Sequence, residues 1–202
     1  MIAFLHDIGK ANAGFQVRYW RERAKRPAAW TVAECGHGPQ GWALFGQGLH
    51  GAARVTAGLP LQAMAGWGAA VDGLLHASIS HHGRPVGDEA TFSIWQPVRD
   101  GAHCLYDPAD TVAAMGARVQ ALYPQAFADA APDLPEAPAF THLFAGLVQL
   151  ADWLGSDTRP GFFPYSQPGE DRATTAPQRA RHALRAVGLD VGDAPVRLAS
   201  TG

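Results

Sequence analysis

Six side chains in four short stretches of the sequence have the chemistry of metal ligands. In chain order they are His6 and Asp7 in HDIGK, His37 in GHGPQGW, His81 and His82 in SHHG, and Asp152 in LADWLGSD. Imidazole nitrogens combined with carboxylates suit a first-row transition metal such as Mn, Fe, Co, Ni or Zn, whereas an all-oxygen set suits Mg or Ca. Because a carboxylate has two oxygens, Asp7 could bridge two ions, and two ions roughly 4 Å apart are the standard arrangement for phosphoester cleavage.

Each stretch taken alone also has an ordinary structural explanation. Adjacent His and Asp residues are common by chance, and a His doublet at a helix end can act as a cationic cap because it suits the helix dipole. Asp152 is harder to explain in this way, since it lies between Ala151 and Trp153 in a strongly apolar helix. A carboxylate there must face solvent, form an ion pair or bind a metal. The combination of the four stretches therefore favours a metal site over coincidence.

The elements that carry these residues are expected to be helices. Apolar residues at helical spacing predict helices over residues 61–83 and 139–157, of which the second has the stronger pattern. Weaker patterns predict helical structure in residues 1–26, 38–55 and 109–122, and a last helix over about 176–187 with Pro177 near its start and Gly188 at its end. Residues 84–108 carry turn signals without a clean period, and no β-alternation is visible. The predicted class is therefore all-α.

Composition places the chain among globular proteins that work inside the cell. It has 202 residues, 47% of them hydrophobic, which suits a domain with a sizeable core. No apolar run reaches the roughly 18 residues that span a membrane and no signal peptide is visible, so the expected location is cytoplasmic. Two cysteines, Cys35 and Cys104, argue against a disulfide scaffold or a Cys-based zinc site. With a net charge of −2, the protein as a whole does not attract nucleic acid, so a phosphate-bearing substrate must be bound by a local group of residues.

The four stretches, in this order, resemble the HD-domain metal-dependent phosphohydrolases and, more narrowly, the HD nuclease domain of the CRISPR-associated nuclease–helicase of type I systems. The similarity covers roughly residues 1–165, and LADWLGSD is its most specific part because the wider superfamily lacks this motif. The resemblance implies a helical bundle around a di-metal site and a prokaryotic, metal-dependent endo- or exonuclease that cuts single-stranded DNA. Such an enzyme would degrade the strand displaced when a crRNA-guided surveillance complex opens its target in antiviral defence.

The resemblance also implies a role for each residue. The metal ligands would be Asp7 bridging both ions, His6 and Asp152 on the first ion, and His37, His81 and His82 on the second. Lys10 matches the lysine that follows the HD pair, where it would contact the scissile phosphate or order the site; a solvated surface lysine is the alternative. The remaining histidines are expected to be structural or surface residues: His50, His76, His103, His142 and His182.

Two departures from the family pattern concern the ends of the chain. The family has a further histidine on a helix upstream of the HD pair, and no such helix precedes His6 in this sequence, so we expect the first ion to lack one ligand here. Either an upstream segment supplies that ligand, or water takes its place on a weakly bound ion. No Walker A pattern occurs, so we expect either a stand-alone nuclease subunit or a domain that needs a helicase partner. Residues 166–202 are then expected to form a C-terminal helix and tail that lead toward an absent helicase module, which a partner would supply.

The basic segment VRYWRERAKRP, residues 17–27, mixes arginines and a lysine with Tyr19 and Trp20. It suits a track for single-stranded DNA, with cations for phosphates and aromatic rings for bases, or equally a solvated helix face. Two other functions stay open. The same ligands would serve an HD phosphohydrolase acting on nucleotides, or a catalytically weak HD module that docks on a CRISPR helicase or surveillance complex. A nucleotide-substrate panel would test the first, and metal content the second.

Overall fold

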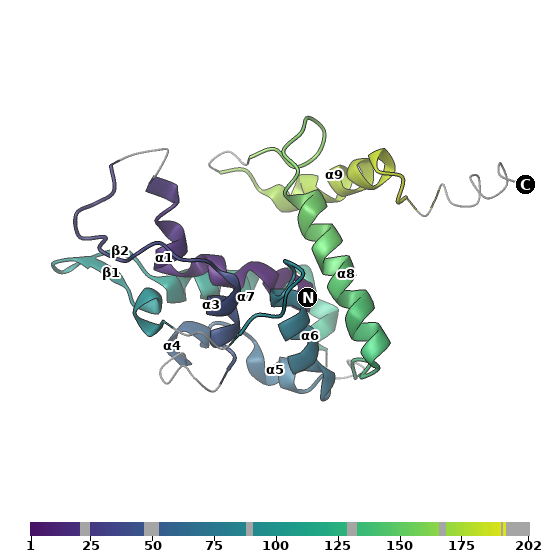
Figure 1. The fold of residues 1–202 in the computed structure, drawn as a ribbon, viewed down its shortest axis with the longest axis horizontal. Helices are drawn as coiled ribbons and strands as arrows, with labels where there is room; N and C mark the ends of the chain where they lie inside the picture. Colours follow the sequence, from purple (N-terminus) through teal and green to yellow (C-terminus); the bar gives the residue numbers. More distant parts are fainter. Residues whose placement is uncertain are drawn as a thin grey trace, which may run out of the picture. The chain divides into compact units, whose positions relative to one another are not determined.

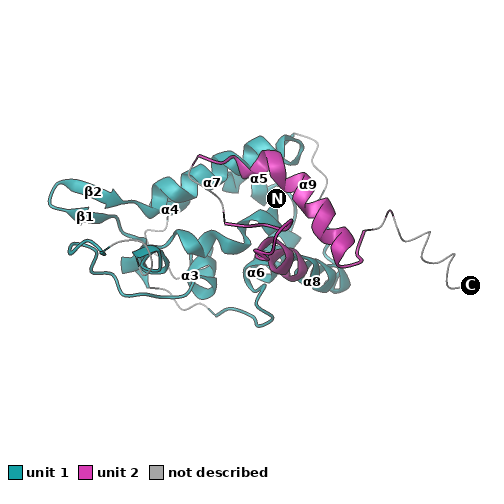
Figure 2. Cartoon of the chain, turned by 90° about the horizontal axis from the view of Figure 1, so that it is seen from above, with its two compact units in different colours: residues 1–148 teal, residues 149–202 magenta. Residues whose placement is uncertain are grey.

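Helices make up most of the structure, which is a computed structural model of the chain (Figure 1). It describes residues 1–20, 25–46, 53–87, 91–128, 133–165, 169–190 and 192. Two compact units divide the chain, Met1–Val148 and Gln149–Gly202, and Figure 2 shows them in different colours. The predicted helical class is confirmed, with one small two-stranded sheet added to it in the described residues.

The first unit is organised around η1 (Ile2–Ala11), a 3-10 helix at the start of the chain. Its buried apolar residues recur at intervals of three: Ile2, Leu5, Ile8 and Ala11. Because a 3-10 helix has three residues per turn, this spacing places all four on one face. The polar residues His6, Asp7 and Lys10 are only partly buried, so η1 separates an apolar face from a polar one.

Three helices pack against η1 and contribute to the main core with it: α3 (Gly38–Ala43), α6 (Ala70–Ile79) and α7 (Pro108–Leu122). A short helix, α1 (Ala13–Gln16), follows η1 directly, and Asn12 caps it by accepting a hydrogen bond from the backbone N–H of Phe15 at 2.7 Å. The short helix α4 (Ala53–Thr56) packs against α7, and its Arg54 donates two hydrogen bonds of 2.9 Å to Asp107, the N-cap residue of α7.

The predicted helix over residues 61–83 is interrupted in the structure. It consists of α5 (Leu61–Ala65) and α6, and Gly68 between them has a φ of +91°. This left-handed conformation is open to glycine but costly for other residues, so the chain turns there instead of continuing as one helix. The predicted helix over 38–55 is observed in part as α3; residues 47–52 lie outside the described part of the chain, as do Arg21, Arg23 and His50.

A β-hairpin between residues 98 and 106 contradicts the expectation of an irregular segment without strands. Its strands, β1 (Val98–Asp100) and β2 (His103–Tyr106), pair antiparallel and are joined through Gly101, which has a φ of +55°. With three and four residues, the strands are too short to show a readable alternation of apolar and polar residues. The 3-10 helix η2 (Phe92–Trp95) precedes the hairpin. Val98 belongs to a small second core with Ala13, Val17 and Trp30.

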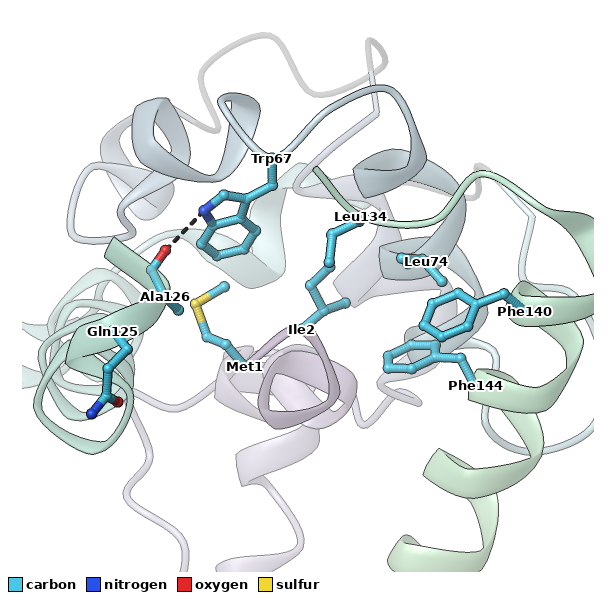
Figure 3. Close-up of a pocket in the computed structure, with 9 residues that line it drawn as sticks. All are labelled: Met1, Ile2, Trp67, Leu74, Gln125, Ala126, Leu134, Phe140 and Phe144. Carbon is cyan, nitrogen blue, oxygen red and sulfur yellow. Dashed lines mark hydrogen bonds between the residues drawn. The ribbon is translucent and has the colours of Figure 1, made fainter. Parts of the chain in front are cut away.

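The first residues of η1 line an apolar pocket of about 260 Å³ (Figure 3). Its walls also include residues of the 3-10 helix η3 (Pro124–Phe127) and of α8 (Pro138–Gly155). Figure 3 shows Ile2, Leu74, Phe140 and Phe144 around it. The indole N–H of Trp67 donates to the backbone carbonyl of Ala126 at 2.9 Å, so the polar atom of this large ring is satisfied within the apolar wall.

The last two helices agree with the predicted ones in most of their length. α8 runs from the first unit into the second as one helix, within two residues of its predicted bounds. α9 (Arg172–Ala186) begins about four residues earlier than predicted because Asp171 caps it, accepting from the backbone N–H of Ala173 at 3.1 Å. Pro177 therefore lies inside the helix and not near its start, whereas Gly188 follows its end with a φ of +75°, as predicted. No helix in the described residues is long and apolar enough to cross a membrane.

Candidate metal centre

Asp7, on the polar face of η1, is the meeting point of several predicted site residues. Its Oδ1 lies 3.2 Å from Nε2 of His37 and 3.8 Å from Nε2 of His81. Its Oδ2 lies 3.2 Å from Nε2 of His6 and 2.5 Å from Nζ of Lys10. Residues that are up to 75 positions apart in the sequence thus surround one carboxylate, and both of its oxygens have nitrogen neighbours.

Three imidazoles lie close together at the ends of two helices, and two of them, His37 and His81, face Asp7. His37 is the N-cap residue of α3, and His81 and His82 lie in the turn that follows α6. One ring nitrogen from each lies within 4.8 Å of the other two, and Nε2 of His37 is 3.1 Å from Nε2 of His82. We call His37, His81 and His82 the histidine trio. The resemblance assigned these three residues to one ion, and their arrangement is suited to that role.

Two glycines allow α3 to bring His37 so close to η1. A Cβ atom added to Gly9 would lie 1.9 Å from the backbone oxygen of His37, and one added to Gly41 would lie 3.0 Å from the backbone nitrogen of Gly9. The two backbones therefore touch where a side chain would hold them apart. The same oxygen of His37 accepts the backbone N–H of Gly41 at 2.7 Å, which begins α3.

Backbone carbonyl groups determine which ring nitrogen of two histidines carries the proton. Nδ1 of His6 lies 2.8 Å from the carbonyl oxygen of Ala3, and Nδ1 of His81 lies 3.0 Å from that of Ser78. Because a carbonyl oxygen can only accept, Nδ1 must be the donor in each ring, and in the neutral ring Nε2 then carries a lone pair. Histidines that bind metals are commonly oriented by such a hydrogen bond from their other nitrogen.

The buried atoms of this cluster provide a test of whether a metal would fit. Within the described residues, Oδ1 of Asp7 and Nε2 of His81 are both buried and have no hydrogen-bond partner, although they lie 3.8 Å apart. Burial lowers the pKa of His81, which favours its neutral form. A carboxylate oxygen and a neutral Nε2 both present lone pairs, so neither can satisfy the other, and a cation would satisfy both. The donor set therefore fits a metal ion.

The electrostatics of Asp7 favour its ionised form. Burial alone would raise the pKa of this carboxyl group, but the neighbouring side chains of His37, His6 and Lys10 outweigh burial and hold the pKa of Asp7 well below its usual range. A carboxylate that stays ionised can bind a cation without first losing a proton.

Asp152 lies on α8 in the second unit, and its Oδ1 accepts a hydrogen bond of 3.3 Å from the hydroxyl of Ser156. Its assignment as a metal ligand stays a prediction. Lys10, for which a solvated position was the alternative, pairs with Asp7. Of the other histidines, His76 contacts the carbonyl of Val86 at 3.0 Å, and three lie exposed on other elements: His103, His142 and His182.

Asn12 was not identified from the sequence, although its side chain supports the cluster. It is fully buried, and its Nδ2 donates to the carbonyl of Gly9 at 2.7 Å and to that of Gly36 at 3.1 Å. These bonds join the end of η1 to the residue before His37. The sequence signal that could have revealed it is a capping asparagine between two alanines, directly before the short helix α1.

A helical domain in which a His–Asp pair meets further histidines has the features of an HD domain. The family model described as Cas3, HD domain matches residues 1–160, and the chain belongs to this family. Its members are CRISPR-associated, metal-dependent nucleases, as the resemblance implied. No curated protein and no solved structure is significantly similar to the chain.

Proposed function

We propose that this protein is a metal-dependent nuclease that cleaves single-stranded DNA in CRISPR interference by two-metal phosphodiester hydrolysis. The observation that carries the proposal is the histidine trio, of which His37 and His81 face Oδ1 of Asp7 and His82 contacts His37. Two buried lone-pair atoms there, Oδ1 of Asp7 and Nε2 of His81, lack a hydrogen-bond partner within the described residues. The family match supports the nuclease class. Single-stranded DNA, the number of ions and the individual ligands are the proposed additions.

The ligands of the first ion in the proposal are His6, Asp152 and Oδ2 of Asp7, and those of the second are the histidine trio and Oδ1 of Asp7. Bound ions supply Lewis acidity, which makes water a better nucleophile and neutralises charge on the phosphate. The hydrogen bonds from His6 and His81 to backbone carbonyls keep their Nε2 atoms aimed at Asp7. A donor set rich in imidazole favours a transition metal over magnesium. Lys10 is proposed to contact the phosphate that is cleaved.

An aromatic ring and a cation next to the trio support a nucleic-acid substrate. Phe15 contacts His37 edge to face, with ring centroids 5.4 Å apart, and the guanidinium of Arg18 lies 4.5 Å from the centre of the Phe15 ring. Aromatic rings beside cations are the usual features that bind the bases and phosphates of single strands. Lys25 and Arg26 are exposed further along the same basic segment. A CRISPR helicase and a crRNA-guided surveillance complex would present the substrate.

The test is cleavage of end-labelled single-stranded DNA by the purified protein with Mn²⁺, Co²⁺ or Ni²⁺, against duplex DNA and a panel of nucleotides. We expect single-stranded DNA to be cut, and Asp7→Ala to lower the rate at least about 100-fold, since it removes both bridging oxygens. Asp72→Ala is the matched control, because Asp72 is an exposed carboxylate on α6. Turnover of nucleotides alone would replace the proposal with a nucleotide phosphohydrolase, and binding to a helicase without any turnover would favour a docking module.

A further inference from the structure

The two carboxylate oxygens of Asp7 have different neighbours. Oδ1 faces the imidazoles of His37 and His81, whereas Oδ2 contacts the ammonium of Lys10 at 2.5 Å as well as Nε2 of His6 at 3.2 Å. Within the described residues, a lysine ammonium therefore holds one oxygen of the proposed bridging ligand, and the other oxygen faces imidazoles only.

The geometry of η1 explains why Lys10 reaches this oxygen. Residues three apart eclipse one another on a 3-10 helix, so the backbone places Lys10 directly above Asp7. The side chain of Lys10 is 39% exposed and that of Asp7 is 22% exposed, so solvent screens this pair less than it would an ion pair on the open surface. A divalent ion on Oδ2 must use the lone pairs that accept the hydrogen bond from Lys10.

We propose that Lys10 sets the order in which metal ions fill the centre. In order of binding, the ion of the histidine trio and Oδ1 binds first. The ion of His6, Asp152 and Oδ2 is the second to bind, and it binds only when it displaces the ammonium of Lys10. This inference rests on the proposed function, because it concerns the same centre, and it adds a regulatory role for Lys10.

A substrate phosphate gives the displaced ammonium an alternative anionic partner. Binding of the second ion and binding of a nucleic-acid phosphate should therefore favour each other, because each one makes the displacement of Lys10 from Asp7 less costly. Such a coupling is reciprocal: DNA raises the affinity for the second ion by the same factor by which that ion raises the affinity for DNA. The centre would then fill completely when substrate is present.

The experiment is a calorimetric titration of the metal-free protein with Mn²⁺, carried out on the wild type and on three variants. We expect two binding steps in the wild type and a second step about fivefold tighter in Lys10→Met, because the competing ammonium is gone. Lys10→Arg keeps the charge and should keep the weak second step. Arg18→Gln is the control for charge alone, since Arg18 lies above Phe15 next to His37 but makes its ion pair with Glu34. A phosphorothioate oligonucleotide should tighten the second step in the wild type and have less effect in Lys10→Met.

The outcomes separate this inference from the proposed function. A second step that is unchanged or weaker in Lys10→Met, or equally tightened in Arg18→Gln, would overturn the role of Lys10 while leaving a two-ion nuclease intact. Two wild-type steps of equal affinity would have the same consequence. A wild-type protein that binds no Mn²⁺ would overturn the metal centre, and with it both proposals. Thermal unfolding of each metal-free variant shows that it is folded before the titration begins.

Discussion

η1 contributes to two sites of opposite character, the apolar pocket at its first residues and the cluster around Asp7. In the wall of the pocket, the indole N–H of Trp67 has a carbonyl partner, and the other lining residues are apolar except for Gln125 (Figure 3). In the cluster, Oδ1 of Asp7 and Nε2 of His81 are buried without a hydrogen-bond partner in the described residues. In the pocket wall, the buried polar N–H of Trp67 is hydrogen-bonded within the chain. In the cluster, the buried lone pairs of Asp7 and His81 need a bound cation.

The pocket stabilises the fold with or without metal, whereas the cluster stabilises it only when an ion is bound. Burial of apolar surface stabilises the fold whether or not a metal ion is bound. The facing lone pairs of Asp7 and His81 lower the stability of the folded state as long as no ion is bound. An ion that binds only the folded state then stabilises that state by mass action. We therefore expect changes in the pocket to act on unfolding with or without metal, and changes in the cluster to act mainly through metal binding.

The largest effect on stability is expected from Trp67→Ala. Removing a buried indole leaves a cavity, and such substitutions lower the free energy of unfolding by about 3–5 kcal/mol. Urea denaturation of the metal-free protein measures this loss, and Leu143→Ala, at a position 61% exposed on α8, should change it by no more than about 0.5 kcal/mol. Below its unfolding temperature, Trp67→Ala should still bind Mn²⁺; loss of binding in a folded variant would show that the two regions are not independent.

His81→Ala should have the largest effect on function after Asp7→Ala. It removes the buried Nε2 that faces Oδ1 of Asp7, so we expect at least about a 100-fold loss of cleavage rate and a smaller rise in melting temperature on adding Mn²⁺. His76→Ala is the matched control, because His76 lies on α6 but its ring contacts the carbonyl of Val86 and the ring of Trp42. Equal losses in the two variants would mean that His81 is structural, like His76.

Gly9→Ala tests how closely the cluster depends on contact between η1 and α3. The new Cβ would lie 1.9 Å from the backbone oxygen of His37, so α3 must move, and we expect a cost of about 1–3 kcal/mol in stability together with weaker Mn²⁺ binding. Gly73→Ala on α6 has nothing within 4 Å of its added Cβ and should stabilise the helix by up to about 1 kcal/mol. Unchanged metal affinity in Gly9→Ala would show that the position of His37 tolerates this movement.

The sequence was informative about the cluster because ligand chemistry is visible in residue types. His6, Asp7, His37, His81 and His82 could be named as candidates from composition, spacing and resemblance, and the structure brings them together. Gly9 and Asn12 were not named, because their roles depend on how closely two backbones approach in the fold, and the capping signal at Asn12 indicates only the start of a helix. The predicted role of Asp152 stays untested, since the residue belongs to the other unit.

The fold shows a similar limit. The 18-residue α8 was predicted almost to its ends because a long apolar stripe gives a strong periodic signal. The hairpin at Gly101 was missed because its strands are three and four residues long, and the break at Gly68 was missed because one glycine within an apolar pattern does not show whether a helix continues. The pocket could not be predicted at all, since residues from both ends of the first unit line it.

The smallest effect is expected at Ser78, which contacts both regions through different atoms. Its hydroxyl donates to the backbone carbonyl of Ile2 at 3.2 Å, next to the pocket, and its own carbonyl oxygen lies 3.0 Å from Nδ1 of His81. Ser78→Ala removes the first bond and keeps the second, so it should cost about 1 kcal/mol of stability in urea denaturation and leave Mn²⁺ affinity unchanged. Because the backbone carbonyl alone orients His81 in this scheme, a variant that folds normally but binds Mn²⁺ more weakly would show that the hydroxyl also positions the trio. The stability of the apolar pocket and the metal affinity of the cluster would then be coupled through Ser78 and would not be independent.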